Sequence, residues 1–326
     1  MKNILVTGGT GFVGSHLLFN LVKRGYTPIA LKRKESKFDV IKNLFIKNNS
    51  DFLFKKIKWV NCELYDLINL EKYIKSIDTI FHCAGYVSFK KSEKNKIFET
   101  NYLGTKNLIN LSLKHTISKF CHVSSIATLS NSRNNNYISE SDWFSINEKK
   151  SHYAHSKYLG EMEVWRGFNE GLKGFIINPS LIIGPNNKNS LFGKIFPKLI
   201  NNTVFYPNGG TGFVDVRDVS EILILLAEKN IHNERYIINN RNLTFKELIK
   251  LIAKNTNKKE PKYKIGTNLI KLFILINKVF NPFGDLNFSM IEFLKSYSSY
   301  SNKKIIDELD FKFIPIEKTI KEIVSI

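Results

Sequence analysis

The sequence predicts an α/β protein built on a doubly wound parallel sheet, with a smaller, interleaved and mostly helical carboxyl-terminal substrate domain. Short apolar strands alternate with longer amphipathic helices through the first half of the 326-residue chain, which is the rhythm of a parallel sheet. Three glycines lie at a fixed stagger between the first strand and the first helix. After residue 180, prolines and paired glycines interrupt the rhythm. We therefore expect one domain over 1–180, with 213–240 packing back on it, and a second over 181–212 and 241–326.

The individual elements follow from apolar runs and their period. Strands are expected at 3–7, 27–31, 57–61, 79–83, 119–124 and 174–178, and helices at 14–24, 67–75, 97–115 and 153–170. A further periodic stretch over 218–229 is expected to pack on the sheet, and the segment from 244 onward is expected to be mostly helical. Because crossovers within one sheet are right-handed, ligands should gather at the carboxyl ends of the strands.

The glycine stagger is the most informative local pattern. Gly8, Gly11 and Gly14 follow the apolar run that begins at residue 4. In this order the first glycine takes the tight turn, the second lets backbone approach a phosphate, and the third allows close packing of helix on strand. The N–H groups where the helix opens, at Phe12 and Val13, would hold the phosphates. The pattern predicts a dinucleotide site in a Rossmann domain.

Composition excludes several other classes of protein. The net charge of +20 raises the possibility of nucleic-acid binding, but lysines are scattered and no basic stripe stands out, so a solvated lysine-rich surface is the better interpretation. Cys62, Cys83 and Cys121 are odd in number and widely spaced, which fits neither a disulfide framework nor a metal site. The run 269–280 is too short to span a bilayer, and core packing explains it better than a membrane surface. We expect a cytoplasmic protein with no metal, no nucleic acid and no membrane span.

Tyr153 and Lys157 form the second decisive pattern, in the segment Tyr153-Ala-His-Ser-Lys157. At positions i and i+4 of a helix they project from one face. A tyrosine titrates near pH 10, and a nearby ammonium should stabilise the phenolate and lower that pKa. The pair would then donate and accept a proton in a carbonyl–alcohol interconversion. Such a pair is also common on ordinary helix surfaces, so its meaning depends on its neighbours.

Those neighbours are present. Ser125 follows the fifth strand, and Asn101 lies on the helix expected beside that of Tyr153. With the glycine loop, this set resembles the extended short-chain dehydrogenase/reductase superfamily, that of NAD-dependent epimerases and dehydratases. The resemblance extends over essentially the whole chain and includes the segments 82–85, 178–185 and 213–219.

The resemblance implies a role for each of these residues. Tyr153 would be the catalytic acid/base, Lys157 would also hold the nicotinamide ribose, and Ser125 would orient the substrate oxygen. Asn101 would support a proton path through water. Cofactor contacts are further implied at Ala84, Gly85, Pro179, Ser180, Glu63 and Leu64, with glutamate standing where the family usually has aspartate beside the adenine.

Cofactor choice depends on the end of the second strand. NAD-preferring enzymes place a carboxylate there, whereas a 2′-phosphate requires a cation. This chain has Arg33, with Lys37 nearby, in Ala30-Leu-Lys-Arg-Lys34. Arginine can form a fork of hydrogen bonds and can stack on adenine. We expect a preference for NADP(H) over NAD(H); a basic loop in a basic protein is the alternative.

The leading hypothesis is an NAD(P)-dependent oxidoreductase that interconverts a carbonyl and an alcohol. The segment Ser125-Ile-Ala-Thr-Leu-Ser130 lacks the Val-Tyr-Gly of sugar-nucleotide enzymes and is similar to the dihydroflavonol reductase and 3β-hydroxysteroid dehydrogenase branch. A nucleotide-sugar epimerase or dehydratase with a tightly held cofactor is the first alternative. A non-catalytic NADP sensor is the second, although it would have no need of Tyr153 and Lys157.

Three further interpretations concern the surroundings of the site. Aromatic side chains suggest an apolar substrate pocket, and these are Phe89, Tyr137, Phe192, Phe196 and Phe213. A homodimer through the helices over 97–115 and 153–170 would resemble the family habit, with contacts from Phe98, Leu108, Trp165 and Phe168; burial within one subunit explains these residues equally well. His82 and His122 are interpreted as core or sheet-end histidines.

Overall fold

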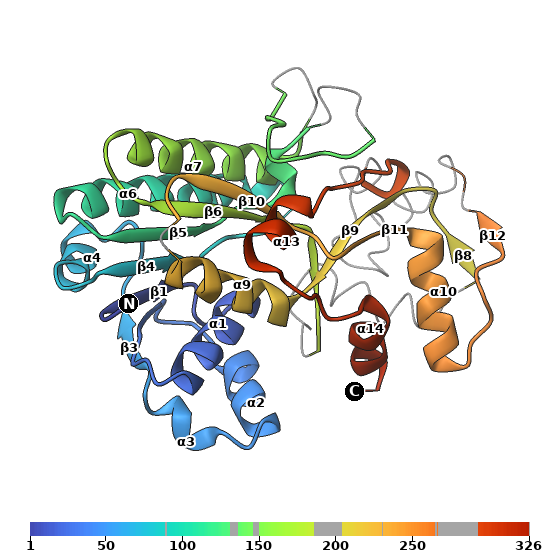
Figure 1. Ribbon diagram of the computed structural model, residues 1–326, viewed down its shortest axis with the longest axis horizontal. Coiled ribbons are helices and arrows are strands. Elements are labelled where there is room, and N and C mark those ends of the chain that lie inside the picture. Colours follow the sequence, from blue (N-terminus) through green and yellow to red (C-terminus); the bar gives the residue numbers. More distant parts are fainter. Residues whose placement is uncertain are drawn as a thin grey trace.

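A computed structural model describes residues 1–88, 90–130, 136–145, 150–185, 204–229, 231–264, 266 and 293–325. Its centre is a seven-stranded parallel sheet in the order β10-β6-β5-β4-β1-β2-β3, seen edge-on between two helical layers in Figure 1. The strands are β1 (Ile4–Thr7), β2 (Ile29–Lys32), β3 (Lys58–Asn61), β4 (Thr79–His82), β5 (Lys119–Val123), β6 (Gly174–Pro179) and β10 (Glu234–Ile238). The predicted doubly wound parallel sheet is confirmed.

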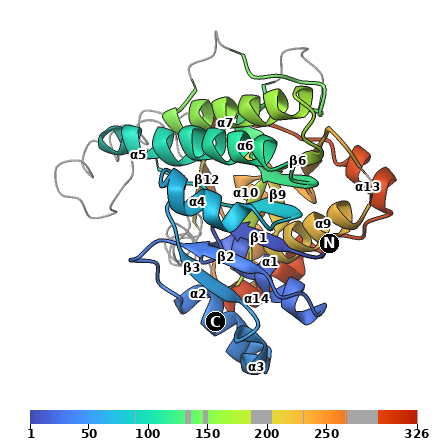
Figure 2. The same ribbon diagram turned by 90° about the vertical axis from the view of Figure 1, so that its left-hand side faces the viewer.

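Helices cover both faces of this sheet. Helices α4 (Leu67–Ile74), α6 (Gly104–Lys114) and α7 (His152–Asn169) share one apolar core with the sheet, around Phe120 and Ile176. Helices α1 (Phe12–Lys23), α2 (Asp39–Lys47) and α9 (Val216–Glu228) share the core of the other face, around Phe81 and Phe175. Figure 2 shows α6 and α7 on one side of the sheet and α1 and α2 on the other.

Each of the six predicted strands has its counterpart in the sheet, and β10 is an addition. It pairs in parallel with β6, from Glu234 opposite Phe175 to Ile238 opposite Pro179. The helix expected over 97–115 is three consecutive elements, α5 (Lys94–Phe98), a π-helical turn (Glu99–Leu103) and α6. Helix α2 and the short α3 (Asp51–Phe54) were not predicted.

The carboxyl-terminal part of the chain combines helices with small sheets. Strands β7 (Leu181–Ile183), β9 (Gly210–Asp215) and β11 (Arg241–Thr244) form a three-stranded sheet, and β8 (Phe205–Tyr206) pairs with β12 (Tyr263–Lys264). Helix α10 (Phe245–Thr256) begins with a capping box between Thr244 and Glu247 and packs with α14 (Ile316–Val324). Helix α13 (Lys303–Leu309) lies against β10. The segment 269–280 lies outside the described residues, as does the turn expected at Pro282.

The apolar side chains considered for a dimer interface divide into two kinds. Leu108 and Phe168 are buried inside the subunit, whereas Phe98 and Trp165 are partly exposed on the outer helical layer. His82 and His122 are fully buried in the sheet, as predicted. Within the described ranges, no helix has the length and apolar character needed to cross a membrane.

Candidate active site

The glycine loop after β1 brings backbone closer together than any side chain would allow. Gly8 has φ of +67°, and a Cβ there would lie 2.6 Å from the backbone that follows β4. A Cβ on Gly14 would lie 2.2 Å from the carbonyl oxygen of Gly8, so α1 packs directly on the turn. Gly11 is the N-cap of α1, and no side chain caps this helix. Its first turn, opened by Phe12 and Val13, therefore presents backbone N–H groups to an anion. This cradle fits a dinucleotide pyrophosphate.

The loop after β4 is tied to the glycine turn by a buried hydrogen-bond chain. The amide of Ala84 donates to Oγ1 of Thr7 over 3.1 Å, and Oγ1 of Thr7 lies 2.7 Å from Nδ1 of His82. Nε2 of His82 lies 2.9 Å from Oγ1 of Thr105 on α6. A Cβ on Gly85 would stand 3.6 Å from the side-chain oxygen of Asn101. This series of hydrogen bonds fixes the carboxyl ends of β1 and β4 relative to one another.

Ser125, Tyr153 and Lys157 converge where β5 ends and α7 begins. Ser125 is the N-cap of a short 3-10 turn (Ile126–Thr128), and its side chain hydrogen-bonds to Tyr153 on α7. Lys157 is buried one turn further along α7, and its Nζ donates to the carbonyl oxygen of Val123 over 2.7 Å. The three predicted catalytic residues are therefore brought together. In the sheet, β4 alone separates β5, which Ser125 follows, from β1.

The electrostatics of the tyrosine differ from expectation. Burial raises the pKa of Tyr153, and the Ser125 hydrogen bond lowers it in part. The expectation that Lys157 depresses this pKa is wrong for the structure, because the ammonium group is directed to the Val123 carbonyl. Burial lowers the pKa of Lys157 itself to about 8, against the opposing effects of Glu161 and Cys83. Tyr153 is thus a neutral phenol at pH 7, the form that can donate a proton.

Asn101 is buried and its side chain is fully engaged. Its amide nitrogen donates to the carbonyl of Tyr86 over 3.0 Å and to Oγ of Ser156 over 2.9 Å, and its oxygen accepts from the Tyr86 amide over 2.8 Å. The residue lies in the π-helical turn, an irregularity frequent at functional sites. A Cβ on Gly160 would stand 2.2 Å from the Asn101 carbonyl oxygen, so α7 packs on this turn at close range. Asn101 therefore connects α7, through the neighbour of Lys157, with the loop after β4.

The predicted nicotinamide contacts lie at the far end of β6. Pro179 is the last residue of the strand and pairs with Ile238 of β10. Ser180 is buried, and its amide donates to the Ile238 carbonyl over 2.9 Å. Both residues are thus held by backbone pairing, at the same edge of the sheet as Ser125.

The predicted adenosine end is more open. Arg33 directly follows β2 with 47% of its side chain exposed, and its Nε lies 3.9 Å from Oε1 of Glu35. Lys37 is exposed. Burial raises the pKa of Glu63, and the charge of Arg33 lowers it. Leu64 packs under α6, whose Gly104 would place a Cβ 2.9 Å from it. Arg33 and Glu63 therefore interact across the neighbouring ends of β2 and β3.

A buried ion pair that was not predicted from the sequence lies behind the predicted catalytic residues. Glu161, on α7, is bound by Nη1 of Arg235, on β10, over 2.9 Å, and their side chains are 1% and 4% exposed. Asn178 on β6 donates to the same carboxylate over 2.9 Å. The position of Glu161 one turn after Lys157 was a usable signal. Arg235 gave none, because a charged residue in a short strand is expected at the surface.

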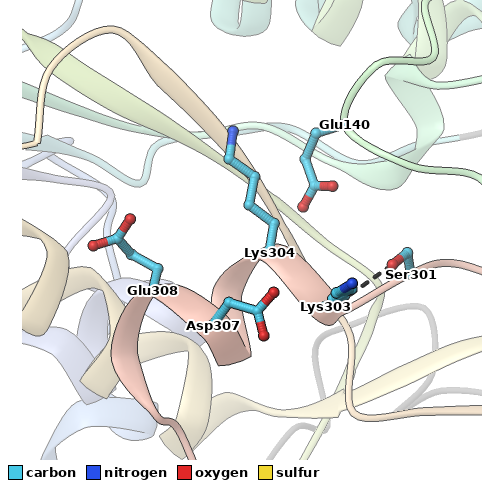
Figure 3. A pocket seen from close by; sticks show the side chains of 6 residues that line it. All are labelled: Glu140, Ser301, Lys303, Lys304, Asp307 and Glu308. Atoms are coloured by element: carbon cyan, nitrogen blue, oxygen red, sulfur yellow. Dashed lines mark hydrogen bonds between the residues drawn. The ribbon is translucent and has the colours of Figure 1, made fainter.

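The hollow shown in Figure 3 borders Arg235, because Glu140 and Lys304 in its lining both hydrogen-bond to that arginine. It has a volume of about 520 Å³ and lies beside α13. It is lined by Glu140, Ser301, Lys303, Lys304, Asp307 and Glu308. The mixture of acids and lysines gives it no dominant charge, and it includes none of the residues predicted for cofactor or catalysis.

The predicted substrate aromatics are only partly described. Tyr137 is exposed, and Phe213 is fully buried in the core between the three-stranded sheet and α10, so Phe213 is a core residue. Phe89, Phe192 and Phe196 lie outside the described residues. In the described part of the chain, no group of three or more His, Cys, Asp or Glu side chains is placed to hold a metal ion.

The parallel sheet, the glycine cradle and the Ser125–Tyr153–Lys157 set define a nucleotide-dependent enzyme of the Rossmann class. A family model described as the NAD dependent epimerase/dehydratase family matches residues 4–239. The chain therefore belongs to that family, within the extended short-chain dehydrogenase/reductase superfamily.

Relatives and solved structures extend the comparison. The chain is 28% identical over 286 residues to "Putative dihydroflavonol 4-reductase" of Synechocystis sp., covering 86% of this chain and 80% of the relative. It is 26% identical over 332 residues to cinnamoyl-CoA reductase 1 of Petunia hybrida, covering 99% and 91%. The crystal structure of gox2253 matches with a TM-score of 0.82 at 24% identity, covering 100% and 97%. The structure of UDP-glucose 4-epimerase of Thermotoga maritima, solved with UDP-glucose, matches with a TM-score of 0.76 at 22% sequence identity, covering 99% of this chain and 98% of the epimerase. Both likenesses concern the fold.

Proposed function

We propose that this protein is an NADP(H)-dependent oxidoreductase that interconverts a carbonyl and an alcohol, with Tyr153 as the acid/base. The convergence of Ser125, Tyr153 and Lys157 at the end of β5 carries the proposal. Similarity to proteins named as reductases over most of the chain supports it.

The residues divide the chemistry among them. When bound, the nicotinamide supplies or accepts the hydride. In the direction of reduction, the neutral phenol of Tyr153 donates its proton to the carbonyl oxygen. The Ser125 hydroxyl holds that oxygen against the phenol, which supplies positioning and charge stabilisation. The Lys157 ammonium, anchored to the Val123 carbonyl, is proposed to bind the nicotinamide ribose hydroxyls.

The preference for NADP(H) is proposed from the end of β2. Arg33 is exposed there and is held only loosely by Glu35, so its guanidinium can turn to a 2′-phosphate. Lys37 adds a second cation on the same exposed segment. Glu63 is proposed to contact the adenine, and Leu64 to pack beside it.

The test is NADPH oxidation by the purified protein with a panel of ketones, aldehydes and nucleotide sugars. We expect net NADPH oxidation with at least one ketone or aldehyde. Isomerisation of a nucleotide sugar with no added cofactor, and no net oxidation with any carbonyl, would contradict the proposal.

An isomerase of nucleotide-linked sugars is the second candidate. It is favoured by the fold shared with UDP-glucose 4-epimerase over nearly the whole of both chains. Such an enzyme would retain its cofactor through purification, which the absorbance of the purified protein and the release of cofactor on denaturation would reveal.

A further inference from the structure

Glu161 is a buried carboxylate at the centre of the hydrogen bonds that hold the chain around Ser125. Its Oε2 accepts from Oγ of Ser124 over 2.5 Å and from Oγ1 of Thr128 over 2.9 Å. The same oxygen accepts from Nδ2 of Asn178 over 2.9 Å. Ser124 and Thr128 lie on either side of Ser125 in the chain, so a single carboxylate oxygen fixes the turn from which the Ser125 side chain projects.

Asn178 reinforces the same turn from β6. Its Nδ2 also lies 3.1 Å from the carbonyl oxygen of Ser125 and 2.9 Å from Oγ1 of Thr128. The amide therefore bridges the carboxylate of Glu161 and the backbone of Ser125. Loss of the carboxylate would free both the hydroxyl groups and this bridge.

Arg235 completes the arrangement on the other side of the carboxylate. Its Nη1 donates to Oε1 of Glu161 over 2.9 Å. Its Nη2 donates to the carbonyl oxygens of Glu140 and Asp142, the latter over 2.9 Å. Its guanidinium lies 4.4 Å from the ring centre of Trp143. The ion pair thus connects the catalytic turn with the segment 136–145, which flanks the start of α7.

Because Glu161 and Arg235 are both buried, either charge alone would cost the folded state free energy. A buried charge without its partner is strongly destabilising, whereas apolar residues often replace a buried pair without loss of stability. Stability alone therefore gives little reason for an ion pair at this place. Its partners instead belong to the turn that presents Ser125, to the helix that presents Tyr153 and to the neighbouring segment 136–145.

We propose that Glu161, held by Arg235, is a positioning residue that aligns Ser125 with Tyr153 and provides the counter-charge for Lys157. The inference rests on the proposed catalytic role of these three residues. It assigns Glu161 no contact with substrate or cofactor, because Glu161 acts through the turn and through α7.

The counter-charge can be followed by pH. Burial lowers the pKa of Lys157 to about 8, and Glu161 is the largest influence that raises it. The other titratable groups with an electrostatic effect at Lys157, or adjacent to it in the site, are Cys83, His82, His122 and Tyr153. The histidine pKa values are lowered by burial and the Cys83 pKa is raised to about 12. Glu161, which is ion-paired with Arg235, is the one carboxylate among these groups. Without it, Lys157 loses its proton at a lower pH.

The test compares Glu161→Gln with a matched control on the same helix. Glu163→Gln makes the same substitution in a carboxylate paired with Arg166 at 2.8 Å, outside the site. NADPH dissociation constants are measured by fluorescence titration from roughly pH 6 to pH 10. In Glu161→Gln we expect the alkaline loss of affinity to begin roughly one pH unit lower than in the wild type. Glu163→Gln should keep the wild-type profile.

A second pair of variants separates positioning from charge and covers the case in which Glu161→Gln does not fold. Ser124→Ala and Thr128→Val each remove one donor to the carboxylate and leave its charge in place. We expect kcat for carbonyl reduction to fall roughly tenfold or more in each, with an unchanged pH midpoint for NADPH binding. Unchanged kcat in both, or a pH profile of Glu161→Gln equal to that of Glu163→Gln, would overturn the inference.

The outcome can be distinguished from failure of the proposed function. If no carbonyl substrate is reduced by the wild type, the proposed function fails, but the pH dependence of NADPH binding in Glu161→Gln still tests the counter-charge. A shifted profile in that case supports the charge relation, and an unshifted one overturns it.

Discussion

The carboxyl ends of β4, β5 and β6 differ from those of β2 and β3 in how their side chains are held. At the proposed catalytic end, Lys157 and Glu161 are buried, and each is hydrogen-bonded to a residue of another element. At the adenosine end, Arg33 and Lys37 are exposed and lie on a loop. In the proposed function, buried side chains would thus fix the geometry of the reaction, whereas cofactor choice would depend on exposed side chains that can change at little cost in stability.

The largest effect is expected at the catalytic end, from Tyr153→Phe. The ring and its packing remain, but the proton donor is lost, so kcat for carbonyl reduction should fall on the order of 10²- to 10⁴-fold. The NADPH dissociation constant should stay near the wild-type value. Steady-state kinetics and fluorescence titration measure the two quantities.

Tyr158→Phe is the matched control for this change. Tyr158 lies on the same helix and stacks on Phe144 with ring centres 4.5 Å apart, so its hydroxyl can be removed while the stack remains. Full activity in Tyr153→Phe would refute the acid/base role. Equal losses in the two variants would point to damage of the helix.

Gly8→Ala should affect both ends, because Gly8 lies at their junction. A left-handed alanine costs about 1–3 kcal/mol, and here its Cβ would also meet the backbone of Ala84 at 2.6 Å. Gly25→Ala isolates the first effect, since Gly25 has φ of +90° with nothing within 4 Å of its Cβ position. Urea denaturation should show a larger loss of unfolding free energy for Gly8→Ala than for Gly25→Ala. Only Gly8→Ala should also lose NADPH affinity. Equal losses of stability would contradict the close approach.

His122 probes the interior behind the catalytic end. It is fully buried, and in the described structure neither ring nitrogen has a hydrogen-bond partner. Burial lowers its pKa well below the ordinary 6.5, so below that pH the unfolded chain takes up a proton that the folded chain does not. The folded state therefore loses stability as pH falls, by about 2 kcal/mol at pH 5 from this residue.

His122→Leu, of similar volume, should remove this contribution. The difference in unfolding free energy between pH 8 and pH 5, measured by urea denaturation, should become smaller than in the wild type by about that amount. An unchanged difference would show that His122 takes up protons equally in the folded and the unfolded states, which would contradict the lowered pKa.

The smallest effect is expected at the adenosine end, from Arg33→Ala. Loss of a charge-assisted contact to the 2′-phosphate should weaken NADPH binding roughly tenfold, with NADH binding and thermal stability nearly unchanged. Lys58→Ala, an exposed lysine at the opposite end of β3, should alter neither cofactor. A wild-type protein that binds NADH more tightly than NADPH would overturn the preference itself.

Much of the fold was predictable because its signals are local. Apolar runs located six strands, and the glycine stagger placed the turn after β1. Strand β10 was missed because it begins with Glu234 and Arg235. Charged residues are expected at the surface unless their buried partners are known. Helix α2 was missed because its apolar positions lie among lysines and asparagines, although it buries Ile41 and Phe45.

The site divides in the same way. Ser125, Tyr153 and Lys157 follow from motifs, since each lies at a fixed place in its element. The pairing of Glu161 with Arg235 joins residues 74 positions apart, and no local pattern connects them. The direction of the Lys157 ammonium also depended on tertiary structure, because the Val123 carbonyl that receives it comes from another element.

Following the hydride itself tests the proposed reaction directly. NADPH carrying deuterium at the transferable position of the nicotinamide ring is supplied with the best carbonyl substrate, and the product is examined by mass spectrometry. We expect deuterium on the product alcohol carbon, at a rate that falls steeply in Tyr153→Phe and changes little in Tyr158→Phe. An isomerised product with no net oxidation of the cofactor would contradict the proposed reaction.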